Sequence, residues 1–81
     1  MKKNIEDLYN LMRTLLVEAR EGAGLSQQDV AARMGKHQTF VSKVEQGQRR
    51  LDLIEFLQMA EVLGIDAHSF IRKLTTNRPR K

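Results

Sequence analysis

Glycines divide this sequence into segments whose apolar residues recur at helical spacing. Gly24, Gly35, Gly47 and Gly64 each follow a stretch in which apolar side chains return every three or four positions. Glycine commonly ends a helix because it adopts the left-handed backbone conformation at little cost. The sequence therefore predicts an all-α fold of five helices, which cover residues 4–22, 26–34, 38–46, 52–63 and 66–74.

Side chains suited to helix capping mark where three of these helices begin. Ser26 with Asp29, and Asp52 with Glu55, have the spacing of a capping box, in which each side chain bonds the backbone of the other residue. Asp66 can cap the last helix. Caps and glycines together define the ends of the helices from both sides.

Length and composition limit the classes of protein to which the chain can belong. Its 81 residues build a single core, so we expect one domain over residues 1–81, with an ordered core at about 5–74 and a basic tail at 75–81. Cysteine is absent, which excludes disulfides and thiolate zinc sites and suits a reducing compartment, the cytoplasm. No apolar run approaches the roughly 20 residues of a membrane span, so we expect a soluble protein with no membrane contact.

Charge is unevenly placed along the chain. The net charge is +4, and residues 36–50 hold Lys36, Lys43, Arg49 and Arg50 against one acid. The segment from 51 to 71 is acidic and rich in apolar residues, and the bases return after it. The placement predicts a basic edge near the middle of the chain.

The second and third predicted helices have the lengths of a helix-turn-helix, in which the second helix of the pair enters the DNA major groove. Lys36 and His37 form the turn between them. The apolar residues of the two helices would face inward: Val30, Ala31, Met34, Val41 and Val44. That orientation turns outward four side chains that can bond to base edges, Gln38, Thr39, Ser42 and Lys43.

The segment LSQQDVAARMGKHQTFVSKVEQG, residues 25–47, resembles the Cro/CI-type, or XRE-family, helix-turn-helix regulators. Those regulators share a pattern close to LSQ-x-x-x-A-x-x-x-G-x-S-Q-S-x-x-S-K-x-E-x-G, and the similarity spans about residues 12–74. The resemblance implies a lambda-repressor-like DNA-binding domain. Two positions depart from the pattern: Lys36 stands where an apolar residue is common, and His37 replaces the usual capping Ser or Thr.

The resemblance also implies a role for each matching residue on double-stranded DNA. Gln38 would read adenine as a bidentate partner, and Thr39, Ser42 and Lys43 would contact neighbouring bases. Gln27 would touch phosphate and brace Gln38. The expected contacts to the DNA backbone are Gln27, His37, Gln46, Gln48, Arg49 and Arg50.

Two further expectations concern the interior and the assembly. In the resembling family an arginine near the end of the first helix pairs with a glutamate near the end of the third, and these positions are Arg20 and Glu45 here. A homodimer on a roughly palindromic operator is expected because one recognition helix covers few base pairs. The candidates for the dimer contact are Phe70, Ile71 and Leu74.

Several alternatives stay open at this point. Gln27, Gln38 and the two loop arginines are also ordinary surface residues, and Phe40 suits packing between helices as well as contact with a thymine methyl. The rival function is a protein-interaction module of the same fold, an antitoxin or adaptor; a restriction-modification controller is another.

The sequence holds no material for an enzyme, since it has neither a glycine-rich phosphate cradle nor a nucleophile beside a base. His37 and His68 are isolated, so no metal is expected. We also expect no cofactor and no small-molecule effector.

Overall fold

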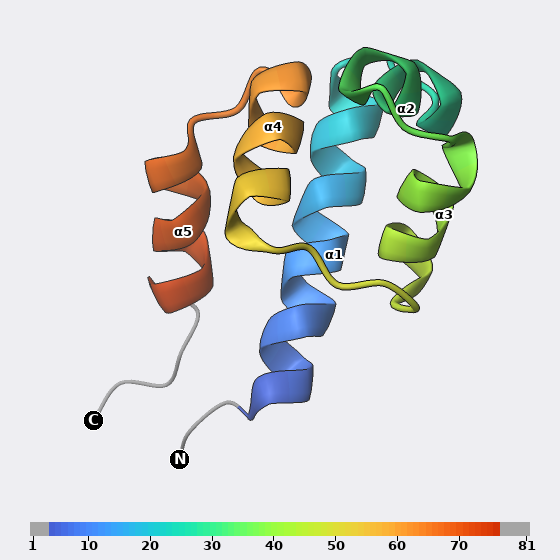
Figure 1. The fold of residues 1–81 in the computed structure, drawn as a ribbon. Coiled ribbons are helices and arrows are strands. Elements are labelled where there is room, and N and C mark those ends of the chain that lie inside the picture. Colours follow the sequence, from blue (N-terminus) through green and yellow to red (C-terminus); the bar gives the residue numbers. More distant parts are fainter. Residues whose placement is uncertain (1–3, 77–81) are drawn as a thin grey trace.

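The computed structural model describes residues 4–76, and in this range it contains five α-helices and no strand (Figure 1). The helices are α1 (Ile5–Gly22), α2 (Gln27–Met34), α3 (Gln38–Gln46), α4 (Leu53–Leu63) and α5 (Ala67–Thr76). The predicted all-α fold is confirmed. Helix α5 runs two residues past Leu74, so it includes the first part of the segment expected as a tail. The rest of that segment, 77–81, lies outside the described residues.

The capping pattern explains where the helices begin. The Ser26 hydroxyl accepts from the Asp29 amide at 3.0 Å, and the Asp29 carboxylate accepts from the Ser26 amide at 2.9 Å. Asp52 and Glu55 form a second box at the start of α4. The Ser26 hydrogen bond lowers the pKa of the Asp29 carboxyl. These bonds satisfy backbone amides that have no partner inside the helix.

The turn between α2 and α3 is short because Gly35 takes the left-handed conformation, with φ at 70°. The Gly35 amide donates to the Ala32 carbonyl, and the Lys36 amide reaches back to Ala31 at 2.8 Å. The chain therefore reverses within three residues and brings the start of α3 against α2.

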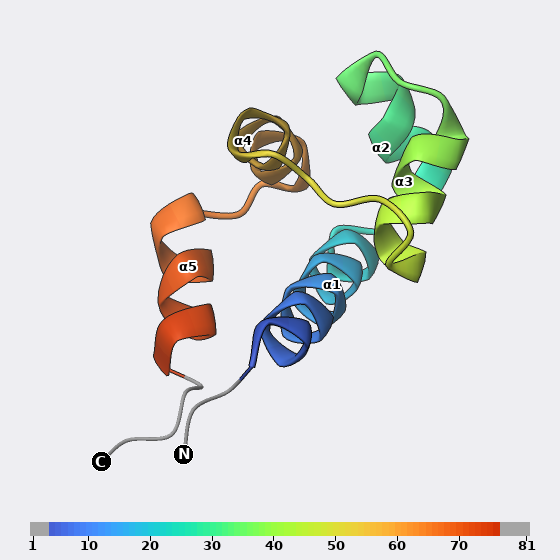
Figure 2. The same cartoon turned by 60° about the horizontal axis from the view of Figure 1, so that its bottom comes forward.

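The core draws on every helix. Helix α2 packs against α3 and α4, and α1 lies between α3 and α5 (Figures 1 and 2). The rings of Phe56 and Phe70 join α4 to α5 with centroids 5.1 Å apart. The buried residues are Leu16, Val30, Ala31, Met34, Val41, Val44, Phe56, Met59, Ala60, Leu63 and Phe70. The five positions of α2 and α3 that the sequence placed inward are all among them.

The spacing of apolar residues predicts inward stripes that include Leu53 and Leu57 in the fourth helix and Ile5 in the first, and the prediction was wrong at these three positions. Leu53 and Leu57 are exposed and Met59 is buried in their place, because α4 turns the face that carries Phe56, Met59, Ala60 and Leu63 to α2 and α5. Ile5 is 63% exposed at the beginning of α1. The α4 segment is apolar on most sides, so periodicity alone does not select its inner face.

Candidate nucleic-acid interface

Helix α3 presents a polar outer side opposite its buried valines. Val41 and Val44 fix its inner side in the core, and Thr39, Lys43 and Gln46 are exposed on the other. Ser42 lies half-buried beside them. The four base-reading candidates thus share one side of α3, with Gln38 at its first position.

A chain of hydrogen bonds begins at Gln38. Its Nε2 donates to Gln27 Oε1 at 3.0 Å, and Gln27 Nε2 donates to Glu45 Oε1 at 2.9 Å. A carboxylate only accepts, so the Gln27 amide must turn its nitrogen to Glu45 and its oxygen to Gln38. Gln38 keeps its own Oε1 and a second N–H, the acceptor and donor that a glutamine offers to adenine.

Glu45 also binds Arg20 and thereby joins α3 to α1. Arg20 Nε and Nη2 donate to the two carboxylate oxygens at 2.7 and 3.1 Å, so the pair is bidentate. The two side chains are only 14% and 10% exposed. Hydrogen bonding to Glu45 raises the pKa of the Arg20 guanidinium. Arg20 also donates to the Leu25 carbonyl at 2.9 Å, so one guanidinium holds α1, the loop before α2, and α3.

A second group lies on the other margin of α3, around the half-buried Phe40 ring. The Lys36 ammonium is 5.0 Å from the ring centroid and the Arg49 guanidinium 4.9 Å. Arg49 Nη1 and Nη2 donate to the two oxygens of Glu55 at 3.0 and 2.6 Å. This bond is the main cause that lowers the pKa of the Glu55 carboxyl.

Lys36 and Glu55 belong to this group although neither was among the predicted site residues. Loop geometry, and not helical period, brings Arg49 and Glu55 together, so no spacing rule signals their contact. Phe40 packs against the core while holding both cations.

The other backbone candidates lie around the same surface. Arg50 stacks on Tyr9 of α1, with its guanidinium 4.0 Å from the ring centroid and 3.4 Å from Glu6. His37, Gln46 and Gln48 are exposed. His37 is the N-cap of α3, but its side chain makes no capping hydrogen bond there.

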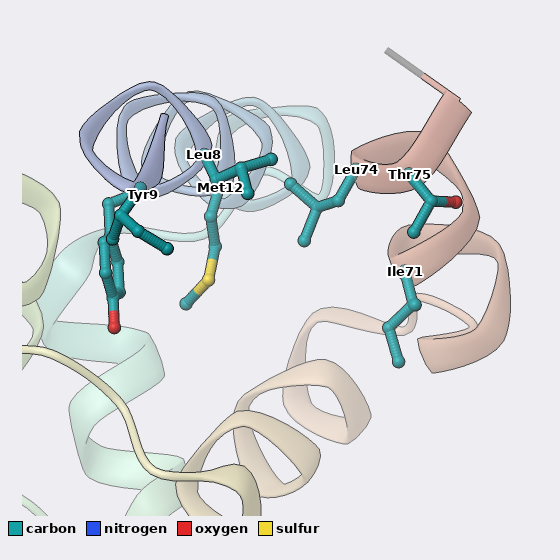
Figure 3. A pocket seen from close by; sticks show the side chains of 7 residues that line it. Leu8, Tyr9, Met12, Ile71, Leu74 and Thr75 are labelled. Carbon is teal, nitrogen blue, oxygen red and sulfur yellow. The ribbon is translucent and has the colours of Figure 1, made fainter. Parts of the chain in front are cut away.

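The dimer candidates separate into a core residue and two surface residues. Phe70 is 5% exposed and its ring lies tilted against that of Phe56 in the core, so little of its side chain is available to a second copy. Ile71 is 45% exposed. With Leu74 it lines an apolar groove of about 350 Å³ between α5 and α1 (Figure 3). The opposite wall carries Ile5, Leu8, Tyr9 and Met12.

Within residues 4–76, no three His, Asp or Glu side chains gather closely enough to hold a metal ion. In the same range, no helix has the length and apolarity to cross a membrane.

Comparison with known proteins places this geometry in a family. A family model described as Helix-turn-helix matches residues 16–70. A protein of Sinorhizobium fredii, the uncharacterized HTH-type transcriptional regulator y4dJ, is 32% identical over 59 residues, which are 73% of this chain and 77% of that protein. An XRE-family like protein from Pseudomonas syringae pv. tomato is 42% identical, with a TM-score of 0.87 over 91% of this chain and 90% of that one. The chain belongs to the XRE family of helix-turn-helix proteins.

The fold of this XRE-family chain is also similar to that of proteins with lower sequence identity. The restriction-modification controller protein C.Esp1396I has a TM-score of 0.77 at 19% identity, and the alignment covers 91% of this chain and 95% of that one. At this identity the likeness concerns the fold alone. As an XRE-family helix-turn-helix, the chain is a DNA-binding protein of transcription regulation.

Proposed function

We propose that this XRE-family protein regulates transcription by reading a specific operator with α3 in the major groove. The observation that supports it best is the chain of hydrogen bonds from Gln38 through Gln27 to Glu45. A surface glutamine normally samples many rotamers, whereas this one is held by a partner that is itself held by a part-buried ion pair. Such preorganisation is what a base-reading side chain requires, because less freedom is lost on binding.

Each candidate residue has a role in this proposal. Gln38, Thr39, Ser42 and Lys43 contact base edges. The residues assigned to the phosphates and sugars position α3 without reading sequence: Gln27, His37, Gln46, Gln48, Arg49 and Arg50.

Replacing Gln38 with alanine tests the proposal. Gln38→Ala should remove a bidentate base contact and weaken operator binding by about 1–3 kcal/mol while leaving non-specific binding almost unchanged. The operator is first selected from a random duplex library, and affinities for it and for a scrambled duplex are measured at equal salt. Gln58→Ala on the exposed side of α4 is the matched control and should bind both duplexes as the parent does.

Equal losses on operator and scrambled duplex would show that Gln38 positions the protein and does not read a base. Failure of the library to yield any enriched sequence would remove sequence-specific reading altogether.

We further propose that the operator is bound by a homodimer and that a second copy of the chain covers the groove between α1 and α5. Met12, Ile71 and Leu74 of this groove also line a neighbouring apolar hollow with Leu53 of α4, which is 66% exposed. A contiguous apolar surface of this kind marks a protein contact. The same surface keeps one rival open, an antitoxin or adaptor that binds a different protein there. The structural similarity to C.Esp1396I supports a second alternative, a controller of restriction-modification genes. The genes that lie beside the selected operator decide between the alternatives.

A further inference from the structure

The Arg49–Glu55 pair lies where a DNA contact is expected, yet Arg49 is already bound to an acid. Both terminal nitrogens of the guanidinium meet the Glu55 carboxylate, at 3.0 and 2.6 Å. A phosphodiester offers a planar guanidinium the same pair of oxygen acceptors. Glu55 therefore occupies the position that a DNA phosphate would take on Arg49.

The two partners differ in how firmly they are held. The Glu55 side chain is 13% exposed, and its Oε1 also accepts the Asp52 amide at 3.0 Å in the capping box of α4. The Arg49 side chain is 42% exposed and lies over the Phe40 ring. If the pair separates, Arg49 is the member that moves, since Glu55 belongs to a helix end.

The surroundings of Arg49 direct it toward the DNA side of the domain. Phe40 is part of α3, and Lys36 lies against the same ring from the turn before α3. Two cations thus flank one ring at the margin of α3, and both act on the same carboxylate: Arg49 through its hydrogen bonds to Glu55, and Lys36 through its charge.

We propose that Glu55 is a positioning residue that holds Arg49 beside α3 as an internal counter-ion, and that Arg49 exchanges this carboxylate for a DNA phosphate on binding. This inference rests on the proposed function. The exchange adds the same cost on every DNA sequence, because phosphates carry no sequence information. Glu55 thereby lowers operator and non-specific affinity by the same factor, so the base-reading side chains supply a larger share of the operator binding free energy.

A double-mutant cycle tests the exchange. Glu55→Gln keeps an oxygen that can cap the Asp52 amide but removes the charge that binds Arg49. We expect it to bind both operator and scrambled duplex about two- to five-fold more tightly than the parent, the range of an exposed ion pair. In an Arg49→Ala background the same substitution should leave the affinity for both duplexes unchanged. Glu61→Gln removes one acid at an exposed position of α4 and measures the general effect of net charge on DNA affinity.

Thermal melts of all variants verify that the fold is intact, and Arg49→Lys supplies a second variant. A lysine keeps the charge but loses the bidentate bond. Glu55→Gln should therefore increase DNA affinity less in the Arg49→Lys background than in the parent.

Elution from heparin separates this inference from the proposed function, because its sulfates compete for Arg49 without any operator. Glu55→Gln should elute at higher salt than the parent, and the double variant should elute with Arg49→Ala. If the protein binds no duplex but its variants elute in this order, the proposed function is wrong, while the role of Glu55 as a counter-ion to Arg49 stands. An equal gain in both Arg49 backgrounds, or weaker binding by Glu55→Gln, would overturn the exchange.

Discussion

Glu45 connects α1 in the interior of the domain to the side of α3 that is proposed to face DNA. Its two oxygens accept from Arg20 twice and from Gln27 once. Gln27 in turn holds Gln38. An acid on a helix that approaches phosphates is unfavourable if exposed, and here it is turned inward and neutralised by Arg20. One side chain thus contributes to the attachment of α3 and, through Gln27, to the orientation of Gln38, the first of the residues proposed to read bases.

Removal of this carboxylate is expected to destabilise the fold. Glu45→Ala leaves the Arg20 charge and the Gln27 amide without their acceptor in a site that is only partly open to water. We expect the free energy of unfolding to fall by about 2–4 kcal/mol, between the values for exposed and fully buried pairs. Urea unfolding measures the change, with Glu61→Ala as a control on exposed α4. A Glu45→Ala variant that unfolds like the parent would contradict the structural role of the pair.

At the scale of the elements, α3 is the helix whose start is least supported. Asn4, Ser26 and Asp52 accept amide hydrogen bonds at the starts of α1, α2 and α4, and Asp66 does so for α5. His37 occupies the same position before α3 without such a bond. The recognition helix therefore depends on its packing and on Glu45 more than on its own cap.

A capping residue at position 37 should stabilise the domain. In His37→Ser the hydroxyl can accept an amide of the first turn of α3, and we expect a gain of about 1 kcal/mol in the free energy of unfolding. Serine is preferred to aspartate here because an added negative charge would face phosphate. His68→Ser in α5 is the matched control and should bring no comparable gain. Thermal unfolding measures the stability of both variants. Equal midpoints for the parent and His37→Ser would show that a capping side chain at position 37 does not stabilise α3.

Sequence patterns foresaw the elements better than their contacts. Helix ends were predictable because caps and glycines act within three or four residues, as at Ser26 and Gly35. The inner face of α4 was not, because apolar residues surround that helix and only its neighbours select Met59 over Leu57. Arg20 and Glu45 were foreseen through the family resemblance alone, and Arg49 with Glu55 not at all, since a loop brings them together. Phe70, a predicted dimer contact, packs against Phe56 in the core, a contact between helices that no local pattern signals.

At the scale of the whole molecule, the two surfaces with assigned roles lie on different helices. The side proposed to read DNA belongs to α2 and α3, and the apolar groove belongs to α1 and α5 (Figures 2 and 3). Contact between two copies through the groove therefore leaves both α3 helices free to face DNA. A two-fold arrangement with recognition helices about 34 Å apart would then match half-sites one helical turn apart.

A charge at Ile71 tests this assembly. Its side chain is 45% exposed at the wall of the groove, so Ile71→Glu should leave the monomer folded while burying an unpaired carboxylate in any dimer formed there. We expect at least about ten-fold weaker self-association by sedimentation, and a similar loss of operator affinity because each half-site must then bind separately. Thr14→Glu adds the same charge to exposed α1 outside the groove and should change neither quantity. A parent that sediments as a monomer at high concentration and binds one copy per operator would end the dimer proposal. An Ile71→Glu variant that still dimerises would move the contact to another face of the molecule.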